Sequence, residues 1–191
     1  MRQAALLVGC VAALSAACGP ATVRPATYSD PEVSCPGGRS AWTLEILDRR
    51  AEREGSDKAV AAIRDGIQKS FPGCKWTVGT SAGTDSVVIE IARFRSYLDG
   101  GVSWEAAVEW SVRAQTAGGG TLTEFQANEE VSRPNYRGSD NEKESLTEAY
   151  QKALERTVKG LRALPANGVF RPPAGTPGTL GNSLDFGGGG P

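Results

Sequence analysis

The sequence contains no histidine, and this absence removes several kinds of chemistry. A Ser-His-Asp triad cannot be built, because no imidazole is present to take the proton from the serine. A zinc site with imidazole ligands is excluded for the same reason. We therefore expect no metal and no cofactor. Two carboxylates acting without histidine are still allowed, so a cell-wall hydrolase of that kind stays open as an alternative.

An excess of positive charge is also missing. The chain has 21 Lys and Arg against 22 Asp and Glu, a formal net charge of -1. A nucleic-acid-binding domain would show a basic stripe or patch, so we expect no nucleic-acid partner. After residue 17 there is no second long apolar run either. Attachment to a membrane would then depend on a lipid rather than on a spanning helix.

The apolar run that is present lies at the start. Met1-Arg2 gives a short positive beginning, and residues 4–17 are uncharged and almost all apolar or small. This is the pattern of a secretory signal peptide, too short and wrongly flanked for a spanning helix. The segment ends at Cys18, which follows Leu14-Ser15-Ala16-Ala17. We expect residues 1–17 to be the signal peptide.

This arrangement resembles the lipobox of bacterial lipoproteins, although Ser15 stands where that family prefers Leu. The resemblance implies cleavage before Cys18 and acylation of its sulfur and new amino group. Residues 7–10 match the box better locally but leave too short an apolar core before them. Gly19 follows the cysteine, whereas an Asp there would favour the inner membrane. The resemblance thus implies a lipid anchor at Cys18 in the outer membrane, with the domain in the periplasm or at the surface.

Two further cysteines, Cys35 and Cys74, belong to the expected mature domain. In an oxidising compartment a disulfide between them is the natural interpretation. A strand, a helix and a second strand are expected after Cys35, which brings Cys74 back to the level where the unit began. The bond would stabilise the fold by about 3–4 kcal/mol in the chain-entropy model. A redox pair is the weaker alternative, because the two do not form a Cys-x-x-Cys motif.

Proline and glycine mark the ends of the expected domain. Residues 18–39 contain four prolines and Gly37-Gly38, which predicts a lipid-anchored flexible tether. Residues 165–191 are again rich in glycine and proline, so we expect a disordered tail, with a tail that folds onto a partner as the alternative. A single domain over 40–164 is expected between them.

The first half of this domain predicts a strand, a helix and two more strands. Residues 41–47 alternate between apolar and polar, which is typical of a strand. Ser56 and Asp57 can begin a helix with an apolar stripe that ends before Pro72-Gly73. A short strand begins at Trp76, and residues 87–94 form a third strand whose run Val87-Val88-Ile89 is typical of a central position.

The second half predicts a long hairpin and a closing helix. Residues 102–114 alternate at every second position, and residues 122–131 return after Gly118-Gly119-Gly120. Ser139 and Glu142 have the spacing of a capping box, and residues 142–164 carry a long amphipathic stripe. The sequence therefore predicts an α+β fold of order β-α-β-β-β-β-α, with a mostly antiparallel sheet and two helices packed on one face.

This layout resembles the small YajG-like and transport-auxiliary envelope lipoproteins. The cysteine start, the strand that ends in Leu47-Asp48-Arg49, the alternating strand 102–114 and the closing helix carry the resemblance. It implies a non-enzymatic accessory role in an envelope assembly, with an envelope protein as partner. The resemblance transfers no binding residues.

The polar face of the long hairpin is the candidate binding surface, because an uncovered sheet face or free edge can take a partner. Its expected members are Arg93, Arg95, Glu105, Glu109 and Arg113, for which ordinary solvent exposure is the alternative. Glu105 and Glu109 lie roughly 13 Å apart along a strand. That exceeds the separation of about 5–9.5 Å in a glycosidase pair. Trp104, Trp110, Trp42 and Trp76 are expected in the core rather than on a ligand-stacking platform.

These patterns together predict a lipid-anchored, non-enzymatic binding or adaptor subunit of an outer-membrane or periplasmic assembly. A carrier or chaperone for a lipid or another hydrophobic ligand is the main alternative, and it would require an apolar cavity between sheet and helices. The carboxylate-based hydrolase is the less favoured alternative.

Overall fold

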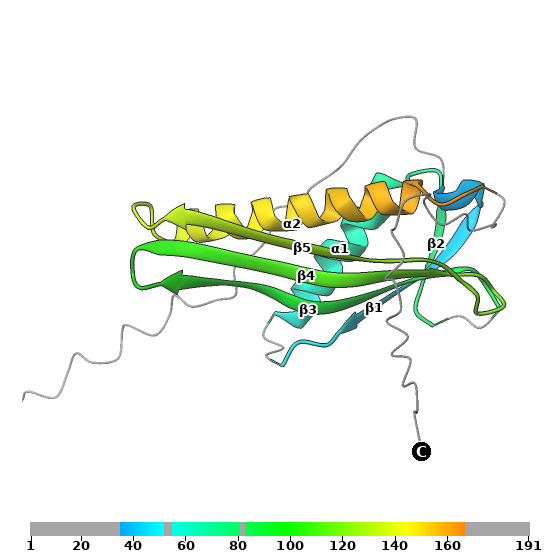
Figure 1. Cartoon of the computed structure of the whole chain (residues 1–191), viewed down its shortest axis with the longest axis horizontal. Coiled ribbons are helices and arrows are strands. Elements are labelled where there is room, and N and C mark those ends of the chain that lie inside the picture. Colours follow the sequence, from blue (N-terminus) through cyan, green and yellow to red (C-terminus); the bar gives the residue numbers. More distant parts are fainter. Residues whose placement is uncertain (1–34, 52–54, 81–82, 167–191) are drawn as a thin grey trace, which may run out of the picture.

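The computed structural model describes residues 35–51, 55–80 and 83–166 of the chain (Figure 1). Most of the expected tether and tail, and Cys18 itself, lie outside these ranges. The elements are η1 (Pro36–Gly38), β1 (Ala41–Asp48), α1 (Ser56–Ser70), β2 (Lys75–Val78), β3 (Ser86–Asp99), β4 (Ser103–Gln115), β5 (Thr121–Pro134) and α2 (Ser139–Arg162).

The strands form one five-stranded sheet in the order β2-β1-β3-β4-β5. Strand β1 runs parallel to both of its neighbours, β2 and β3. The long strands β3, β4 and β5 are joined by two tight connections and pair antiparallel. The sheet is therefore mixed, and the α+β class and the order β-α-β-β-β-β-α are as the sequence predicts. Helix α1 supplies the crossover that a parallel β1–β2 pair needs.

Both helices lie on the same face of the sheet. Helix α2 runs along the long strands and packs mainly on β4 and β5, while α1 lies beside it over β1 (Figure 1). The other face carries no helix among the described residues. Alternate residues of β4, from Ala106 to Ala114, are buried against the helices, and the residues between them form the uncovered face.

The core is closely packed between sheet and helices. Trp110 and Tyr150 are almost wholly buried, and their rings lie 6.3 Å apart between β4 and α2. The indole N–H of Trp110 donates to Thr157 Oγ1 at 2.9 Å, so the buried polar group is satisfied. Tyr150 donates its hydroxyl to the carbonyl of Ala62 at 2.7 Å and thereby joins α2 to α1.

A bulge in β3 changes which side chains face the core. The register with β4 shifts between Ile91 and Arg93, so Ala92 is the extra residue. Before the bulge the odd-numbered Ile89 and Ile91 are buried, and after it the even-numbered Phe94 is buried. The bulge therefore places Arg93 on the uncovered face, opposite Glu109.

The predicted capping box at the start of α2 is wrong. Ser139 is the first helical residue, Gly138 takes the cap position, and no side chain caps the helix there. The carboxylate of Glu142 instead accepts a hydrogen bond from Ser96 on β3 at 2.9 Å. The Glu142 side chain that a capping box would use is therefore engaged in a tertiary contact with β3.

Candidate functional site

The uncovered face of the sheet carries all five residues that the sequence singles out. Arg93 and Arg95 lie on β3, and Glu105, Glu109 and Arg113 lie on β4. The register places Arg93 opposite Glu109, so these charged groups face each other across neighbouring strands. We call this surface the open face. Its use in binding stays a prediction.

Cross-strand ion pairs organise the open face. Arg93 Nε donates to Glu109 Oε2 at 2.6 Å, and its Nη1 reaches Glu130 on β5 at 3.2 Å. Arg113 pairs with Glu124 at 2.9 Å. The hydrogen bond from Arg113 lowers the pKa of Glu124, and the Glu109 carboxylate raises the pKa of Arg93. Both signs of charge are thus interspersed over three strands, a pattern that gives specificity to a docking surface more than raw affinity.

The glutamates of the open face do not have the properties of a hydrolase pair. Glu105 accepts hydrogen bonds from Ser132 at 2.6 Å and Ser103 at 2.8 Å, and these lower the pKa of its carboxyl. Glu109 is held by Arg93. A glycosidase needs a general acid whose pKa is raised. Every carboxyl pKa that is shifted in the described part of the chain is shifted downwards, at Asp48, Glu105, Glu124 and Glu148.

The helix-covered face gives no support to a carrier. A Cβ added to Gly66 would overlap Tyr150 and Leu154, and one added to Gly160 would overlap the ring of Phe125. The helices therefore approach each other and the sheet closely at two separate points. Trp110 and Trp42 are buried as expected, whereas Trp104 and Trp76 are only half-buried. At the two points of close approach the space between the helices and the sheet is filled by side chains.

Sequence reasoning missed several exposed apolar side chains at and near the β3–β4 turn. Tyr97, Leu98 and Val102 are exposed there, and Tyr136 is exposed in the neighbouring connection from β5 to α2. The backbone N–H of Asn135 donates to the carbonyl of Val102 at 2.8 Å, which joins the two connections. The alternating pattern of β4 hides the exposure of Val102, because this residue fits the apolar register of the strand but precedes its first residue.

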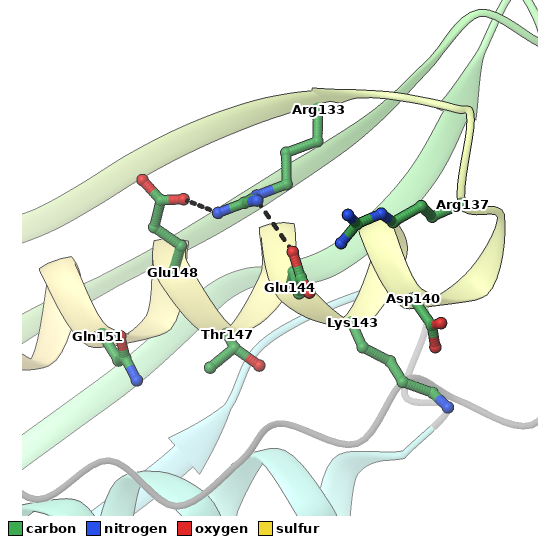
Figure 2. Close-up of a pocket in the computed structure, with 8 residues that line it drawn as sticks. All are labelled: Arg133, Arg137, Asp140, Lys143, Glu144, Thr147, Glu148 and Gln151. Atoms are coloured by element: carbon green, nitrogen blue, oxygen red, sulfur yellow. Dashed lines mark hydrogen bonds and ion pairs between the residues drawn. The ribbon is translucent and has the colours of Figure 1, made fainter.

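A polar groove lies beside the first half of α2 (Figure 2). It has a volume of about 600 Å³ and is lined by Arg133, Arg137, Asp140, Lys143, Glu144, Thr147, Glu148 and Gln151. Arg133 reaches from β5 to Glu144 at 3.0 Å and to Glu148 at 2.7 Å. Hydrogen bonds from Lys152 and, to a smaller extent, from Arg133 lower the pKa of Glu148. The ion pairs of Arg133 with Glu144 and Glu148 therefore hold β5 to α2 along the groove.

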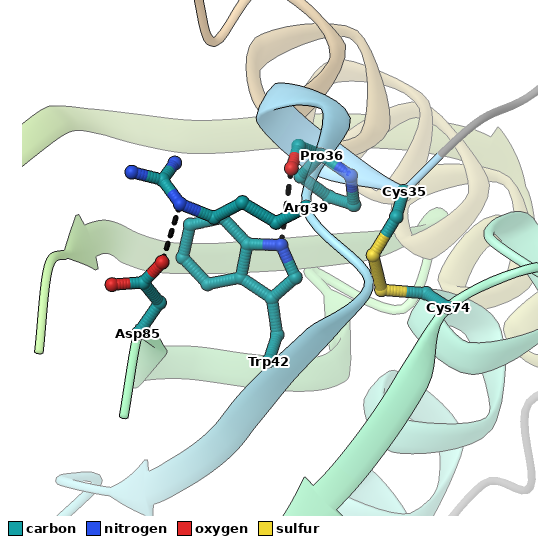
Figure 3. The surroundings of a disulfide bond; sticks show 6 residues. All are labelled: Cys35, Pro36, Arg39, Trp42, Cys74 and Asp85. Atoms are coloured by element: carbon teal, nitrogen blue, oxygen red, sulfur yellow. Dashed lines mark hydrogen bonds and ion pairs between the residues drawn. A yellow bond between two sulfur atoms is a disulfide. The ribbon is translucent and has the colours of Figure 1, made fainter. Parts of the chain in front are cut away.

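The expected disulfide joins Cys35 and Cys74 (Figure 3). Because β1 and β2 are parallel, with Ala41 opposite Lys75, the cysteines that precede them lie at the same end of the sheet. Trp42 lies beside the bond and donates its indole N–H to the Pro36 carbonyl at 3.1 Å. Arg39 stacks over the Trp42 ring and forms an ion pair with Asp85.

Two negative findings apply to the described residues alone. No group of His, Cys, Asp and Glu side chains within them is arranged to hold a metal ion. No described helix is long and apolar enough to cross a membrane.

Comparison with known proteins gives a fold but no family. No family model matches the sequence, and no curated protein matches it. Among solved structures, protein XCC0632 from Xanthomonas campestris, of the family DUF330, superposes with a TM-score of 0.51 at 14% identity. The match covers 74% of this chain and 93% of that one.

Two other similar structures are lipoproteins by description. Lipoprotein GNA1162 from Neisseria meningitidis has a TM-score of 0.44 at 9% identity, over 63% of this chain and 99% of its own. A lipoprotein from Caulobacter crescentus has a TM-score of 0.41 at 15% identity, over 61% and 87%. At these identities the likeness concerns the fold alone. Of the three structures, the Xanthomonas protein has a TM-score above 0.5, so it alone among them supports a shared fold.

Proposed function

We propose that this chain is a lipid-anchored envelope lipoprotein that acts as a non-enzymatic binding or adaptor subunit. Its domain would dock an envelope protein through the open face, with acylated Cys18 holding it at the outer membrane. The single observation that supports docking is the uncovered side of a five-stranded sheet. That side carries a preorganised set of ion pairs across β3, β4 and β5.

The packing of the molecule supports a binding role over the two alternatives. A carrier would need the space that Tyr150, Leu154 and Phe125 fill. A hydrolase would need a carboxyl with a raised pKa, whereas hydrogen bonds lower the pKa of Glu105. An ordered polar surface without such a group is suited to recognition of another protein, because fixed ion pairs make partners of the wrong charge pattern unfavourable.

A photo-reactive residue in place of Ser111 tests this function in intact cells. Ser111 lies near the middle of the open face on β4, between Glu90 and Gln126 of the neighbouring strands. We expect mass spectrometry to identify one dominant envelope protein crosslinked at this position. The matched control carries the same residue at Glu155, which is exposed on α2. Equal products at both positions would contradict docking by the open face, and a lipid adduct at Ser111 would favour the carrier.

The anchor is tested separately with Cys18→Ser. Without a thiol at residue 18 no thioether can form, so labelled palmitate should no longer enter the protein. The wild-type chain should be labelled and should sediment with outer membranes. A Cys10→Ser variant is the control for the second match to the lipobox and should keep the label.

A further inference from the structure

The two edges of the sheet differ greatly in length. Strand β2 forms one edge and has four residues, whereas β5 forms the other and has fourteen. A short edge offers little backbone to a second chain, but a long one is a template for strand pairing. The free edge of β5 is therefore the larger site for strand addition in the described part of the molecule.

The even-numbered residues of β5 direct their backbone groups away from β4. In an antiparallel pair the bonded and non-bonded residue pairs alternate. Asn135 donates its N–H to Val102 at 2.8 Å, which makes the odd-numbered residues of β5 the ones bonded to β4. Pro134 fits this pattern, because its carbonyl turns outwards and accepts a hydrogen bond from Asn141 of α2.

The backbone features that prevent pairing stand at the two ends of this edge and not between them. The outward carbonyl of Pro134 is occupied by α2, and an irregularity near Thr121 disturbs the other end. Between them, residues 123–133 contain no proline, glycine or lysine. Prolines, bulges and charged side chains are the usual means of keeping an edge from pairing, and the charged residues here are Glu124, Glu129, Glu130 and Arg133. The backbone of the middle of β5 is thus left available, and a strand added there must keep the glutamates of the two copies from meeting.

We propose that β5 pairs antiparallel with β5 of a second copy of this chain, about a twofold axis at Asn128. One sheet would then run through both copies, and their open faces would form one continuous surface. The outward N–H and C=O groups of residues 124, 126, 128, 130 and 132 would be bonded in this dimer. The proposal concerns the edge of the sheet and does not depend on what the open face binds.

Charge and the length of paired strand together select the register, because axes outside residues 126–130 would pair fewer residues of the regular stretch 123–133. Even-numbered residues of one copy must lie opposite even-numbered residues of the other, because these residues carry the outward backbone groups. An axis at Ala127 would set Glu124 against Glu130, and axes at Glu129 or Glu130 would set each glutamate against its own copy. An axis at Gln126 would bring Glu130 to Leu122, where the strand is irregular. Like charges directly opposite each other destabilise a sheet.

The axis at Asn128 leaves complementary pairs on both faces. On the open face, Gln126 meets Glu130 and Glu124 meets Ser132. On the face towards the helices, Phe125 meets Val131, an aromatic and β-branched pair of the kind that favours strand pairing. This register therefore uses the whole regular stretch from 123 to 133 without opposing two glutamates.

The helices also have room in this arrangement. Helix α2 lies over β4 and β5, so its axis is set back from the edge by roughly half a strand spacing. With strands about 4.8 Å apart, the two copies of α2 would lie about 10 Å from each other, a normal packing distance for helices. Near the axis Arg156 is already paired with Glu129 at 2.6 Å, so each copy brings a neutralised pair.

Cysteine crosslinking of the full chain in intact cells tests the register. In Asn128→Cys the two new thiols meet at the axis, and we expect a disulfide-linked dimer on a non-reducing gel. In Gln126→Cys the equivalent residues are roughly 13 Å apart along the strands. That is too far for a disulfide, so this variant should stay monomeric. Gln126→Cys combined with Glu130→Cys should restore the dimer. The wild-type chain is run on the same gel as a control for its own cysteines, and it should show no disulfide-linked dimer.

A change of charge at the axis tests the interface without a change of shape. Asn128→Asp sets two carboxylates against each other, and we expect at least a tenfold weaker dimer by analytical ultracentrifugation of the full chain in density-matched detergent. Gln151→Glu makes the same change of charge on exposed α2 and should leave the dimer intact. Monomeric wild-type protein would overturn the proposal, as would a dimer that crosslinks equally at residues 126 and 128.

Discussion

Gly66 of α1 lies directly against the hydroxyl of Tyr150 of α2, so that no Cβ fits between the two helices. The same hydroxyl donates to the Ala62 carbonyl one turn earlier in α1, at 2.7 Å. Burial in this contact raises the pKa of Tyr150. The closeness of α1 and α2 therefore depends on the absence of one side chain.

Replacing Gly66 with alanine should destabilise the fold by about 1–3 kcal/mol, because the added methyl group must displace Tyr150 or Leu154. Thermal unfolding of the purified chain measures this change. Gly73→Ala is the matched control, since no atom lies within 4 Å of a Cβ there. We expect its free energy of unfolding to change by less than about 0.5 kcal/mol. Equal effects at the two positions would show that the helix contact is not the cause.

Thr157→Val should cost about 1–3 kcal/mol, because it leaves the buried indole N–H of Trp110 without an acceptor. The valine keeps the shape of the threonine, so packing changes little. In a double-mutant cycle, Thr157→Val should lower the free energy of unfolding less in the Trp110→Phe background than in the wild-type chain. Denaturant unfolding of the four proteins gives the coupling, and strict additivity would contradict the role assigned to this hydrogen bond.

Reduction of the Cys35–Cys74 disulfide should lower the free energy of unfolding by about 3–4 kcal/mol, because the bond closes a long loop in the unfolded chain. The two residues are separated by 39 positions in the sequence. Unfolding curves with and without reductant measure the difference. A variant with serine at both positions should be as unstable as the reduced protein and should not respond to the reductant.

The ion pair of Asp48 and Arg50 should make stability depend on pH. Arg50 binds both carboxylate oxygens, at 2.9 and 2.7 Å, and its hydrogen bonds hold the pKa of Asp48 far below the usual range. The folded pKa is lower than the unfolded one, so the contribution is complete above about pH 5 and is lost as the pH falls further.

Asp48→Asn removes this contribution, so the difference in unfolding free energy between wild type and variant should be constant from about pH 5 to 8 and shrink in more acidic solution. Chemical denaturation at a series of pH values measures it. Glu155→Gln, at an exposed position on α2, is the control. A difference between wild type and Asp48→Asn that does not change with pH would contradict the assignment.

The elements of the fold follow from periodicity, and the exceptions have identifiable causes. The alternation of residues 102–114 predicts β4, observed as Ser103–Gln115, because one buried face enforces a period of two. The bulge at Ala92 cannot be read in the same way, since an alanine is compatible with either face. The five charged residues lie on one face of the sheet, but the ion-pair partners Glu124 and Glu130 depend on the register of β5, which the sequence does not supply.

The disulfide has a mechanical consequence. Cys35 is where the chain enters the described fold, and the bond ties that point to the residue before β2. A force that pulls on the segment before Cys35 therefore divides between two strands that begin at the same end of the sheet. Without the bond the whole load would fall on β1. In a domain held by its N-terminal side, as we propose for this chain, the cysteine pair would spread the load over β1 and β2.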